Sequence, residues 1–143
     1  MNVEIYSRKA MEDRLKRGFP DNTAVISFCN PPGTHTSKEY APVDYTGAVK
    51  HVFQLAVDDL QNELPEADAL AEFIYRVKSD GLNIICQCES GQSRSAGCAA
   101  AIMKYFCHSG DSIFNDDRYH PDEMVYYSAL DALESYRNKV KMT

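Results

Sequence analysis

One stretch of the chain, residues 84–107, constrains the fold more than any other part of the sequence. It begins with three apolar residues, continues through a polar segment that contains a glycine, and ends in a run of small and apolar residues. This pattern predicts a short buried strand, a tight turn over Cys88–Arg94 and a buried helix over Ser95–Cys107. In such a unit the N–H groups of the turn and of the first helical turn point into one hollow, above the positive end of the helix dipole. The stretch therefore predicts an anion-binding site.

Two side chains of distinct chemistry stand at the ends of the predicted turn. Cys88 begins the turn, and converging N–H donors at a helix N-terminus lower a thiol pKa from ~8.5 into a range of roughly 3.5 to 7.5, so the thiolate is favoured at neutral pH. Arg94 ends the turn and offers a planar fork of donors that matches two oxygens of a phosphate. Gly91 lets the backbone turn without a Cβ that would block the ligand. The turn is therefore expected to combine a nucleophile with a phosphate-binding group.

The residues around the thiol and the guanidinium make the motif specific. A Cys-x5-Arg spacing alone arises readily by chance, but a glycine at the fourth position and a serine directly after the arginine make a chance match rare. The stretch is not the nucleotide-binding loop GxxxxGK[ST], because no lysine follows Gly97. The segment CESGQSRS resembles the Cys-x5-Arg-Ser signature of the cysteine-dependent protein tyrosine phosphatases, in particular the small dual-specificity type. The resemblance covers residues 23–107, and the outer segments agree with it in order and length.

The resemblance implies a role for each residue of the motif. Cys88 would be the nucleophile and Arg94 would hold the phosphate. Ser95 would donate a hydrogen bond to the cysteine sulfur and help it leave the phosphoenzyme; helix N-capping is the alternative role of this serine. The phosphate oxygens would be held by the loop that follows the thiol, namely Glu89, Ser90, Gly91, Gln92, Ser93 and Arg94.

The reaction also requires an acid. Displacement of an alkoxide or phenoxide from phosphorus is faster by about 100- to 10,000-fold when a positioned group protonates the leaving oxygen. In the phosphatases that the motif resembles, an aspartate at a strand end upstream of the cysteine does this. Asp58 and Asp59 end a predicted strand in this chain, and we favour Asp59, because the second acid of such a pair is the catalytic one. The alternative is that both are solvated loop residues.

The implied activity is hydrolysis of phosphotyrosine, with phosphoserine and phosphothreonine as further substrates, through a cysteinyl-phosphate intermediate. It needs no metal and no cofactor. The expected partners are a phosphoprotein or phosphopeptide substrate and phosphate-like anions. Two alternatives stay open: a non-catalytic phosphate-binding module, or pseudophosphatase, and a rhodanese-like or arsenate-reducing thiol enzyme. The position of Asp59 favours the phosphatase over both.

The motif departs from the family pattern at two positions. Gln87 stands where the family usually has histidine, which orients the loop and favours the thiolate; its absence predicts a less depressed pKa for Cys88 and keeps the binding module open as a hypothesis. Glu89 places an anion beside an anion site, which is harmless if its side chain turns outward. Together with Gln92 and the lack of lysine in the loop, Glu89 argues against a phosphoinositide substrate.

The composition of the chain limits its domain count, its partners and its cellular compartment. The chain has 143 residues, a net charge of −6 and 44% apolar residues, which predicts one soluble domain over residues 1–143. The negative charge argues against nucleic acid and anionic membranes as partners. No apolar run approaches the length of a transmembrane helix and no signal-peptide pattern opens the chain. Five cysteines without framework spacing favour reduced thiols. We therefore expect a cytoplasmic protein that acts as a monomer.

Strands and helices are predicted to alternate along the chain, which indicates an α/β sandwich of three layers with a mainly parallel central sheet and a site at the carboxyl ends of the strands. The last helix is expected to turn Met124, Tyr127, Leu130 and Leu133 inward. The expected elements are a strand around Val3 and Ile5, a helix from Ser7 to about Arg17, strands over Thr23–Phe28 and His51–Val57, a helix from Pro65 to Gly81, a short helix over Asp111–Asn115 and a last helix from Pro121.

The other cysteines and the histidines are expected to be structural. Cys86 is predicted to be a buried strand thiol, and Cys98 and Cys107 to lie in the core of a helix. Cys29 ends a strand and could neighbour Cys88, so a reversible disulfide that protects an oxidised nucleophile is a further hypothesis. No spacing of cysteine and histidine predicts a zinc site. The proline-containing loop over residues 30–47 is expected to be a surface excursion, and a recognition element is the alternative. The histidines are His35, His51, His108 and His120.

Overall fold

A run of β-branched and apolar residues forms strand β2 (Thr23–Cys29), which is buried along its whole length. In the computed structural model, which describes residues 1–31, 41–58 and 62–141, β2 pairs on both sides with parallel strands. The four strands of the described part have the order β1-β4-β2-β3 and are all parallel. The predicted α/β fold with a parallel sheet is therefore confirmed. The other strands are β1 (Val3–Tyr6), β3 (His51–Ala56) and β4 (Asn83–Gln87).

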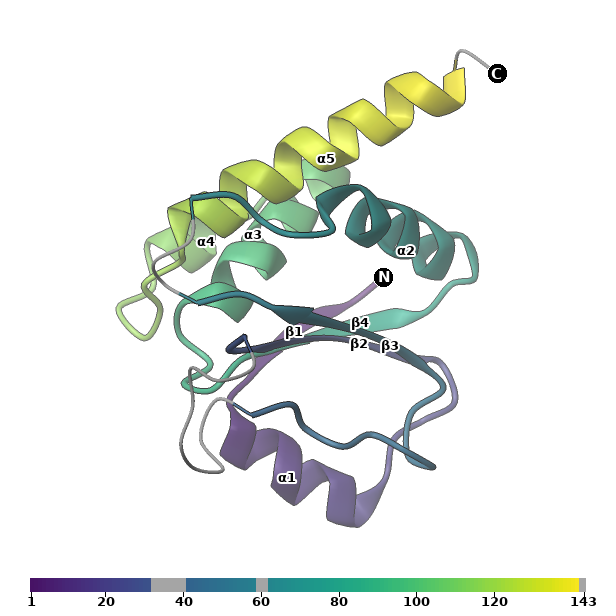
Figure 1. Cartoon of the computed structure of the whole chain (residues 1–143), viewed down its shortest axis with the longest axis vertical. Coiled ribbons are helices and arrows are strands. Elements are labelled where there is room, and N and C mark those ends of the chain that lie inside the picture. The colour runs from purple at the N-terminus through teal and green to yellow at the C-terminus, as the bar shows by residue number, and fades with distance from the viewer. Residues whose placement is uncertain (32–40, 59–61, 142–143) are drawn as a thin grey trace.

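Helices cover both faces of the sheet and complete three layers (Figure 1). Helix α1 lies alone on one face, where the segment 41–49 packs beside it, and the other helices lie on the opposite face. None of the helices within the described ranges is both long and apolar enough to span a membrane. The helices are α1 (Arg8–Arg17), α2 (Ala67–Ser79), α3 (Arg94–Cys107), α4 (Asp111–Phe114) and α5 (Glu123–Lys141).

The helix boundaries follow from local chemistry. The Ser7 hydroxyl accepts a hydrogen bond from the Ala10 N–H at 3.1 Å and so caps α1, as predicted, and Gly18 ends that helix with a positive φ. Helix α2 begins two residues after Pro65, at Ala67, because Glu66 adopts a left-handed conformation that a helix cannot continue through. The predicted short helix α4 is present.

Strand alternation divides the core into two parts. Side chains of successive residues in a strand point to opposite faces of the sheet. Cys86 of β4 therefore packs in the large cluster beneath α2, α3 and α5, whereas Ile85 packs against α1 and the segment 41–49. In that segment Val43 and Tyr45 are buried, so this part of the loop is not the surface excursion that the sequence favoured. Residues 32–40 of the same loop lie outside the described residues.

The buried face of α5 differs from the predicted one. Val125, Ala129, Ala132 and Leu133 are buried, whereas Tyr127 is 60% exposed. Leu133 was predicted correctly, while Met124 and Leu130 are only half-buried. Ala129 and Ala132 lie on the face of α5 that packs against α3 and α2, where their small side chains allow a close approach. The residue just before α5 also lies close to α3, since an added Cβ at Gly97 would lie 2.6 Å from the Asp122 carbonyl oxygen.

Gly97→Ala is expected to destabilise the protein by about 1 to 3 kcal/mol, because its methyl group would force α3 and the start of α5 apart. Alanine is ordinarily the better helix former by ~1 kcal/mol, so the contact reverses the usual sign. Urea unfolding followed by circular dichroism measures the change. Glu134→Ala, at an exposed position of α5, should stay within about 0.5 kcal/mol of wild type. A Gly97→Ala protein as stable as wild type would contradict this packing.

Candidate active site

Cys88 follows the carboxyl end of β4 directly and starts the thiol loop, which we define as residues 88–94. Its side chain is 1% exposed. The Ser95 hydroxyl lies 3.0 Å from the sulfur. The thiol loop leads straight into α3, which begins at Arg94. The strand, turn and helix predicted from residues 84–107 are therefore present, and they place the thiol at the N-terminus of a helix.

The sulfur is surrounded by hydrogen-bond donors. Burial opposes the charged form and by itself would raise the pKa of Cys88. Hydrogen bonds from the Ser95 hydroxyl and from the N–H groups of Ser95, Gly91 and Ser93 outweigh burial, and the net pKa of Cys88 is lowered below its ordinary value. The local structure therefore favours the thiolate, which is the reactive form of cysteine.

Ser95 serves the sulfur and does not cap the helix. It is the second residue of α3, and the N-cap position is occupied by Ser93, whose side chain makes no capping bond. The capping alternative for Ser95 is therefore wrong. The hydroxyl is fully buried and stands at hydrogen-bonding distance from Cys88.

Contacts to the outside of the thiol loop turn its N–H groups inward. The Gln92 carbonyl accepts a hydrogen bond from the His120 N–H at 2.8 Å. In a trans peptide the C=O and the following N–H point in opposite directions, so this bond directs the Ser93 N–H toward the sulfur. The Ser93 carbonyl accepts bonds from the N–H groups of Gly97 and Asp122. The segment between α4 and α5 thus fixes the orientation of the loop.

Two further residues shape the thiol loop itself. Gly91 has a φ of +71°, and a Cβ there would lie 2.7 Å from the Ser7 nitrogen, so only glycine fits. The Ser90 hydroxyl accepts a hydrogen bond from the Gln92 N–H at 3.2 Å and stabilises the turn.

Arg94 is held by the ends of two neighbouring strands. Its Nη1 donates to Asn30 Oδ1 at 2.9 Å, just beyond β2, and to the Val57 carbonyl at 2.5 Å, just beyond β3. The side chain is buried, so its orientation is set by these contacts. We did not predict Asn30 from the sequence, although it follows a central strand at the edge of the sheet where parallel strands place ligand-binding residues.

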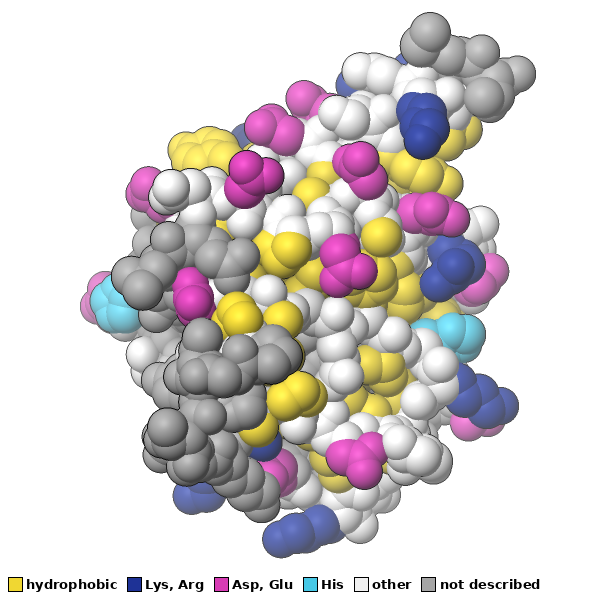
Figure 2. Space-filling view, in the orientation of Figure 1, with side chains coloured by type: hydrophobic (Ala, Val, Ile, Leu, Met, Phe, Trp, Pro, Cys, Tyr) yellow, Lys and Arg dark blue, Asp and Glu magenta, His cyan; other side chains and the backbone are white. Residues whose placement is uncertain are grey.

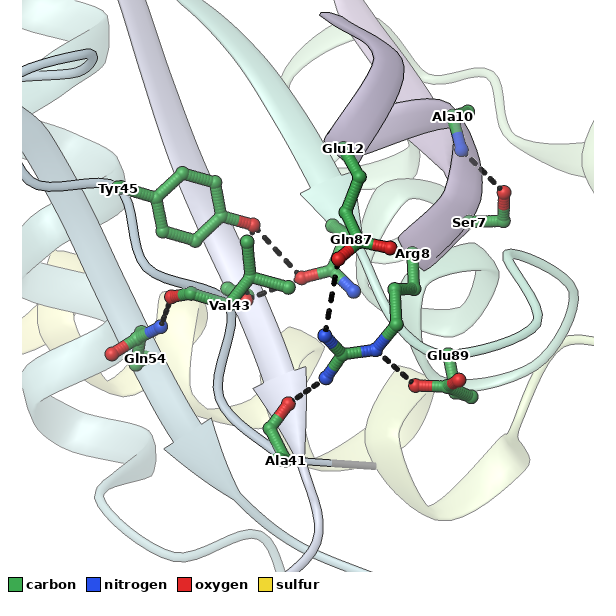
Figure 3. Close-up of polar contacts among 11 residues, drawn as sticks. Ser7, Arg8, Ala10, Glu12, Ala41, Val43, Tyr45, Gln54, Gln87 and Glu89 are labelled. Carbon is green, nitrogen blue, oxygen red and sulfur yellow. Dashed lines mark hydrogen bonds and ion pairs between the residues drawn. The ribbon is translucent and has the colours of Figure 1, made fainter. Parts of the chain in front are cut away.

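The acidic side chain of the thiol loop is paired. Arg8 Nε donates to Glu89 Oε2 at 2.7 Å, and the Arg8 N–H donates to the Glu89 carbonyl at 3.1 Å (Figure 3). Arg8 also donates to the Ala41 carbonyl and lies 3.9 Å from the Glu12 carboxylate. Glu89 therefore turns toward α1, and its charge is balanced there. No local pattern in the sequence marks Arg8 as a residue of this site.

Gln87 is buried in a polar cluster on the opposite face of the sheet from Cys88. Its Oε1 accepts a hydrogen bond from the Tyr45 hydroxyl at 2.9 Å and another from the Ser27 hydroxyl (Figure 3). Burial raises the pKa of Tyr45 to about 12, so this hydroxyl is a neutral donor at physiological pH. Gln87 thus has firm partners at the position where the phosphatase signature usually has histidine.

Asp59, the favoured general acid, lies outside the described residues. Asp58 is the last described residue of this segment and is half-buried. It follows Val57 directly, and the Val57 carbonyl accepts a hydrogen bond from Arg94. The choice between the two aspartates stays a prediction.

The remaining cysteines behave differently from one another. A hydrogen bond with Cys98, together with burial, raises the pKa of Cys86 well above its ordinary value, which fits an inert core thiol. Cys107 is exposed, so its predicted place in the core is wrong: at this end of α3 it is Tyr105 and Phe106 that contact Tyr75 of α2, and Cys107 faces solvent. The Cys29 thiol donates to the Leu55 carbonyl at 3.6 Å. All five cysteines, which lie within the described residues, are free of disulfides, and a disulfide between Cys29 and Cys88 stays a hypothesis.

No metal-binding group is formed by His, Cys, Asp and Glu within residues 1–31, 41–58 and 62–141. His35 lies outside these ranges. The predictions that the protein needs neither a metal nor a cofactor stay predictions.

Solved structures of other proteins have a fold similar to that of this chain. No family model and no curated protein sequence matches the chain. Among solved structures, DUSP15 matches with a TM-score of 0.65 at 14% identity over 99% of this chain and 91% of its own. Human DUSP28 matches with a TM-score of 0.62 at 14% identity over 96% and 94% of the two chains. OH1 from the Orf virus, a tyrosine phosphatase, matches with a TM-score of 0.55 at 12% identity over 94% and 82%.

The chain has the fold of the dual-specificity phosphatases. The resemblance that the motif indicated is thus confirmed at the level of the fold. Within the phosphatase fold of this chain, Cys88, Arg94 and Ser95 come together at the carboxyl edge of the sheet, where open α/β sheets bind ligands.

Ser95→Ala is expected to raise the pKa of Cys88, because burial remains while the hydrogen bond from the hydroxyl is lost. The thiolate fraction near neutral pH then falls, and alkylation of Cys88 by iodoacetamide slows there but not at high pH. Mass spectrometry of the alkylated peptide across a pH series measures the midpoint. Ser112→Ala, at an exposed position of α4, should leave the midpoint unchanged. An unchanged midpoint in Ser95→Ala would show that this hydroxyl does not stabilise the thiolate.

Proposed function

We propose that this chain is a cysteine-dependent phosphatase that hydrolyses phosphotyrosine, with phosphoserine and phosphothreonine as further substrates. The observation that carries the proposal is the environment of Cys88, a buried sulfur with a lowered pKa that accepts from one hydroxyl and the backbone N–H groups of Gly91, Ser93 and Ser95. Because its pKa is lowered, this thiol is suited to act as a nucleophile, and hydrogen-bond donors surround it. The same donors suit the equatorial oxygens of a phosphoryl group, where negative charge sits during transfer.

The first step forms a covalent intermediate. The Cys88 thiolate attacks phosphorus, so that an S–P bond forms while the bond from phosphorus to the leaving oxygen breaks. Arg94 and the backbone amides of the thiol loop hold the non-bridging oxygens. Asp59 donates its proton to the departing phenoxide or alkoxide, which leaves as the neutral alcohol.

The second step releases phosphate. A water molecule attacks the phosphocysteine while the Asp59 carboxylate takes its proton, and the Cys88 thiolate leaves. The Ser95 hydroxyl stabilises this thiolate as it forms, because it already lies at hydrogen-bonding distance from the sulfur. The cycle ends with every group in its starting protonation state. Neither step requires a metal or another cofactor.

The charge distribution supports a phosphoprotein or phosphopeptide as the substrate. The chain carries a net charge of −6. On the face of the described residues that Figure 2 shows, lysines and arginines are scattered among acidic side chains. A polyanion or an anionic membrane would find little attraction on such a surface. We further propose that the protein works as a monomer in the cytoplasm.

The non-catalytic phosphate-binding module is the main rival, and its support came from Gln87. The contacts of Gln87 weaken that argument, since its amide oxygen is held by two hydroxyl donors and can orient the loop without an imidazole. The lowered pKa of Cys88 also favours an enzyme. The position of Asp59 in the sequence, after a strand and upstream of Cys88, favours a phosphatase over a thiol enzyme of the rhodanese or arsenate-reducing type, so the phosphatase remains our proposal.

The metal-free wild-type protein is expected to hydrolyse both a phosphotyrosine peptide and p-nitrophenyl phosphate, and Cys88→Ser should abolish turnover. Asp59→Asn should lower the rate on phosphotyrosine by about 100- to 10,000-fold on the acidic side of the profile. The loss should be smaller for the nitrophenyl ester, because its leaving group depends less on protonation than a phenol of pKa ~10. Steady-state rates from about pH 5 to pH 8, in the presence of a chelator, measure these effects.

Asp58→Asn tests the other aspartate, and Asp131→Asn, at an exposed position of α5, is the matched control that should turn over like wild type. A larger loss in Asp58→Asn than in Asp59→Asn would assign the acid to Asp58. A wild-type protein that binds vanadate but hydrolyses neither ester would overturn the enzyme and leave the phosphate-binding module.

A further inference from the structure

Both sequence neighbours of Cys88 are fastened to one segment that lies far from them in the chain. Gln87 accepts from Tyr45, and Glu89 is bonded to Arg8, which also donates to the Ala41 carbonyl. Figure 3 shows these contacts converging on the end of β4 from α1 and from the segment 41–45. The nucleophile therefore stands between two anchored residues.

The anchor at Gln87 acts on Cys88 through strand geometry. Successive side chains of a strand point to opposite faces, so a fixed Gln87 on one face sets the direction of Cys88 on the other. Gln87 is paired in register with Ser27 of β2, and both hydroxyl donors to its Oε1 are buried. The Tyr45 hydroxyl also lies 3.2 Å from the Ser27 hydroxyl, which closes the cluster.

Tyr45 is itself held in place. Its ring is 5% exposed and belongs to the apolar cluster of Met11, Val25, Val43 and Ile85. The neighbouring Val43 carbonyl accepts a hydrogen bond from Gln54 Nε2 at 2.7 Å, which ties the segment to β3. The hydroxyl of Tyr45 thus reaches Gln87 from a rigid support.

The anchor at Glu89 fixes the other side of the nucleophile. Arg8 bonds this one residue twice, through its backbone N–H and through its guanidinium. Arg8 is the first residue of α1 and is 9% exposed, so the pair is largely shielded from solvent. A lysine could not make the same set of contacts, because it lacks the planar fork.

We propose that Tyr45 and Arg8 are positioning residues for Cys88, which act through Gln87 and Glu89 to hold the start of the thiol loop in its reactive geometry. This inference rests on the proposed phosphatase function. Neither residue is among the hydrogen-bond donors to the Cys88 sulfur. Their effect is on alignment, and a displacement of about 1 Å in an active site can cost roughly 100-fold in rate. The positioning effect of Tyr45 and Arg8 also includes the N–H donors around the sulfur, because the directions of these donors depend on the same loop.

Tyr45→Phe removes the hydroxyl and keeps the ring in the core. It is expected to lower kcat for a phosphotyrosine peptide about tenfold while KM stays within about twofold, because alignment of the nucleophile is affected and substrate binding is not. Tyr105→Phe is the matched control. It removes a hydroxyl that bonds Tyr75 at 2.5 Å on the other side of the sheet, and it should leave kcat and KM unchanged.

Arg8→Lys keeps the charge and loses the fork. It too is expected to lower kcat about tenfold with little change in KM. Its matched control is Arg14→Lys, in the same helix, which loses a hydrogen bond from Nε to the Gly18 carbonyl and should retain wild-type turnover.

A second measurement does not depend on turnover. Iodoacetamide alkylates Cys88, and mass spectrometry across a pH series gives the pH midpoint of that reaction. This midpoint should shift to higher pH in Tyr45→Phe and Arg8→Lys. Alkylation of the exposed Cys107 in the same samples is the internal reference and should not change. Thermal unfolding of all four variants separates a loss of stability from a loss of alignment.

The outcomes distinguish the two proposals. If wild type hydrolyses no phosphate ester, the phosphatase proposal fails, and the alkylation series still decides whether Tyr45 and Arg8 control the thiol. If Tyr45→Phe and Arg8→Lys match their controls in kcat and in the alkylation of Cys88, the positioning role is overturned. The role is overturned as well if each variant and its control lose stability and activity in parallel.

Discussion

Hydrogen bonds to the sulfur of Cys88 are the interaction on which the rest of the site depends. A buried charge without partners is strongly unfavourable, and here burial is nearly complete. The donors come from the Ser95 hydroxyl and from three peptide N–H groups, all within a few residues of the thiol. Because peptide groups cannot move independently, the whole turn must hold its shape for the anion to be stable. The demand for a rigid turn explains why carbonyl groups on its outer side are bonded to other parts of the fold.

The same arrangement lets an acidic protein hold an anion. The chain has a net charge of −6, and the thiol loop itself carries a glutamate. Glu89 is drawn toward Arg8, away from the sulfur, while the buried Arg94 is aligned by Asn30 and Val57. The local electrostatics around Cys88 are thus separated from the charge of the surface, and the donors to the sulfur are neutral: one hydroxyl and three peptide N–H groups.

The local part of the fold and of the site could be predicted from the sequence, and the long-range part could not. Residues 84–107 are contiguous, so their apolar pattern and the motif between them predict a strand, a turn and a helix directly. Arg8, Asn30 and Tyr45 reach the loop only through the order of the strands, and no local pattern marks them. The buried face of α5 was mispredicted for a related reason. Its sequence offers two apolar stripes that share Leu133, and packing against α2 and α3 buries the one that contains the alanines.

One peptide unit joins the thiol to the C-terminal third of the chain. The carbonyl of Gln92 is held by His120, and the N–H of the same peptide plane serves the sulfur. Local opening of the segment before α5 would let this plane rotate and would remove a donor from the anion. Ionisation of the thiol and closure of that segment are therefore thermodynamically linked: the thiolate stabilises the closed segment, and opening of the segment raises the pKa of Cys88.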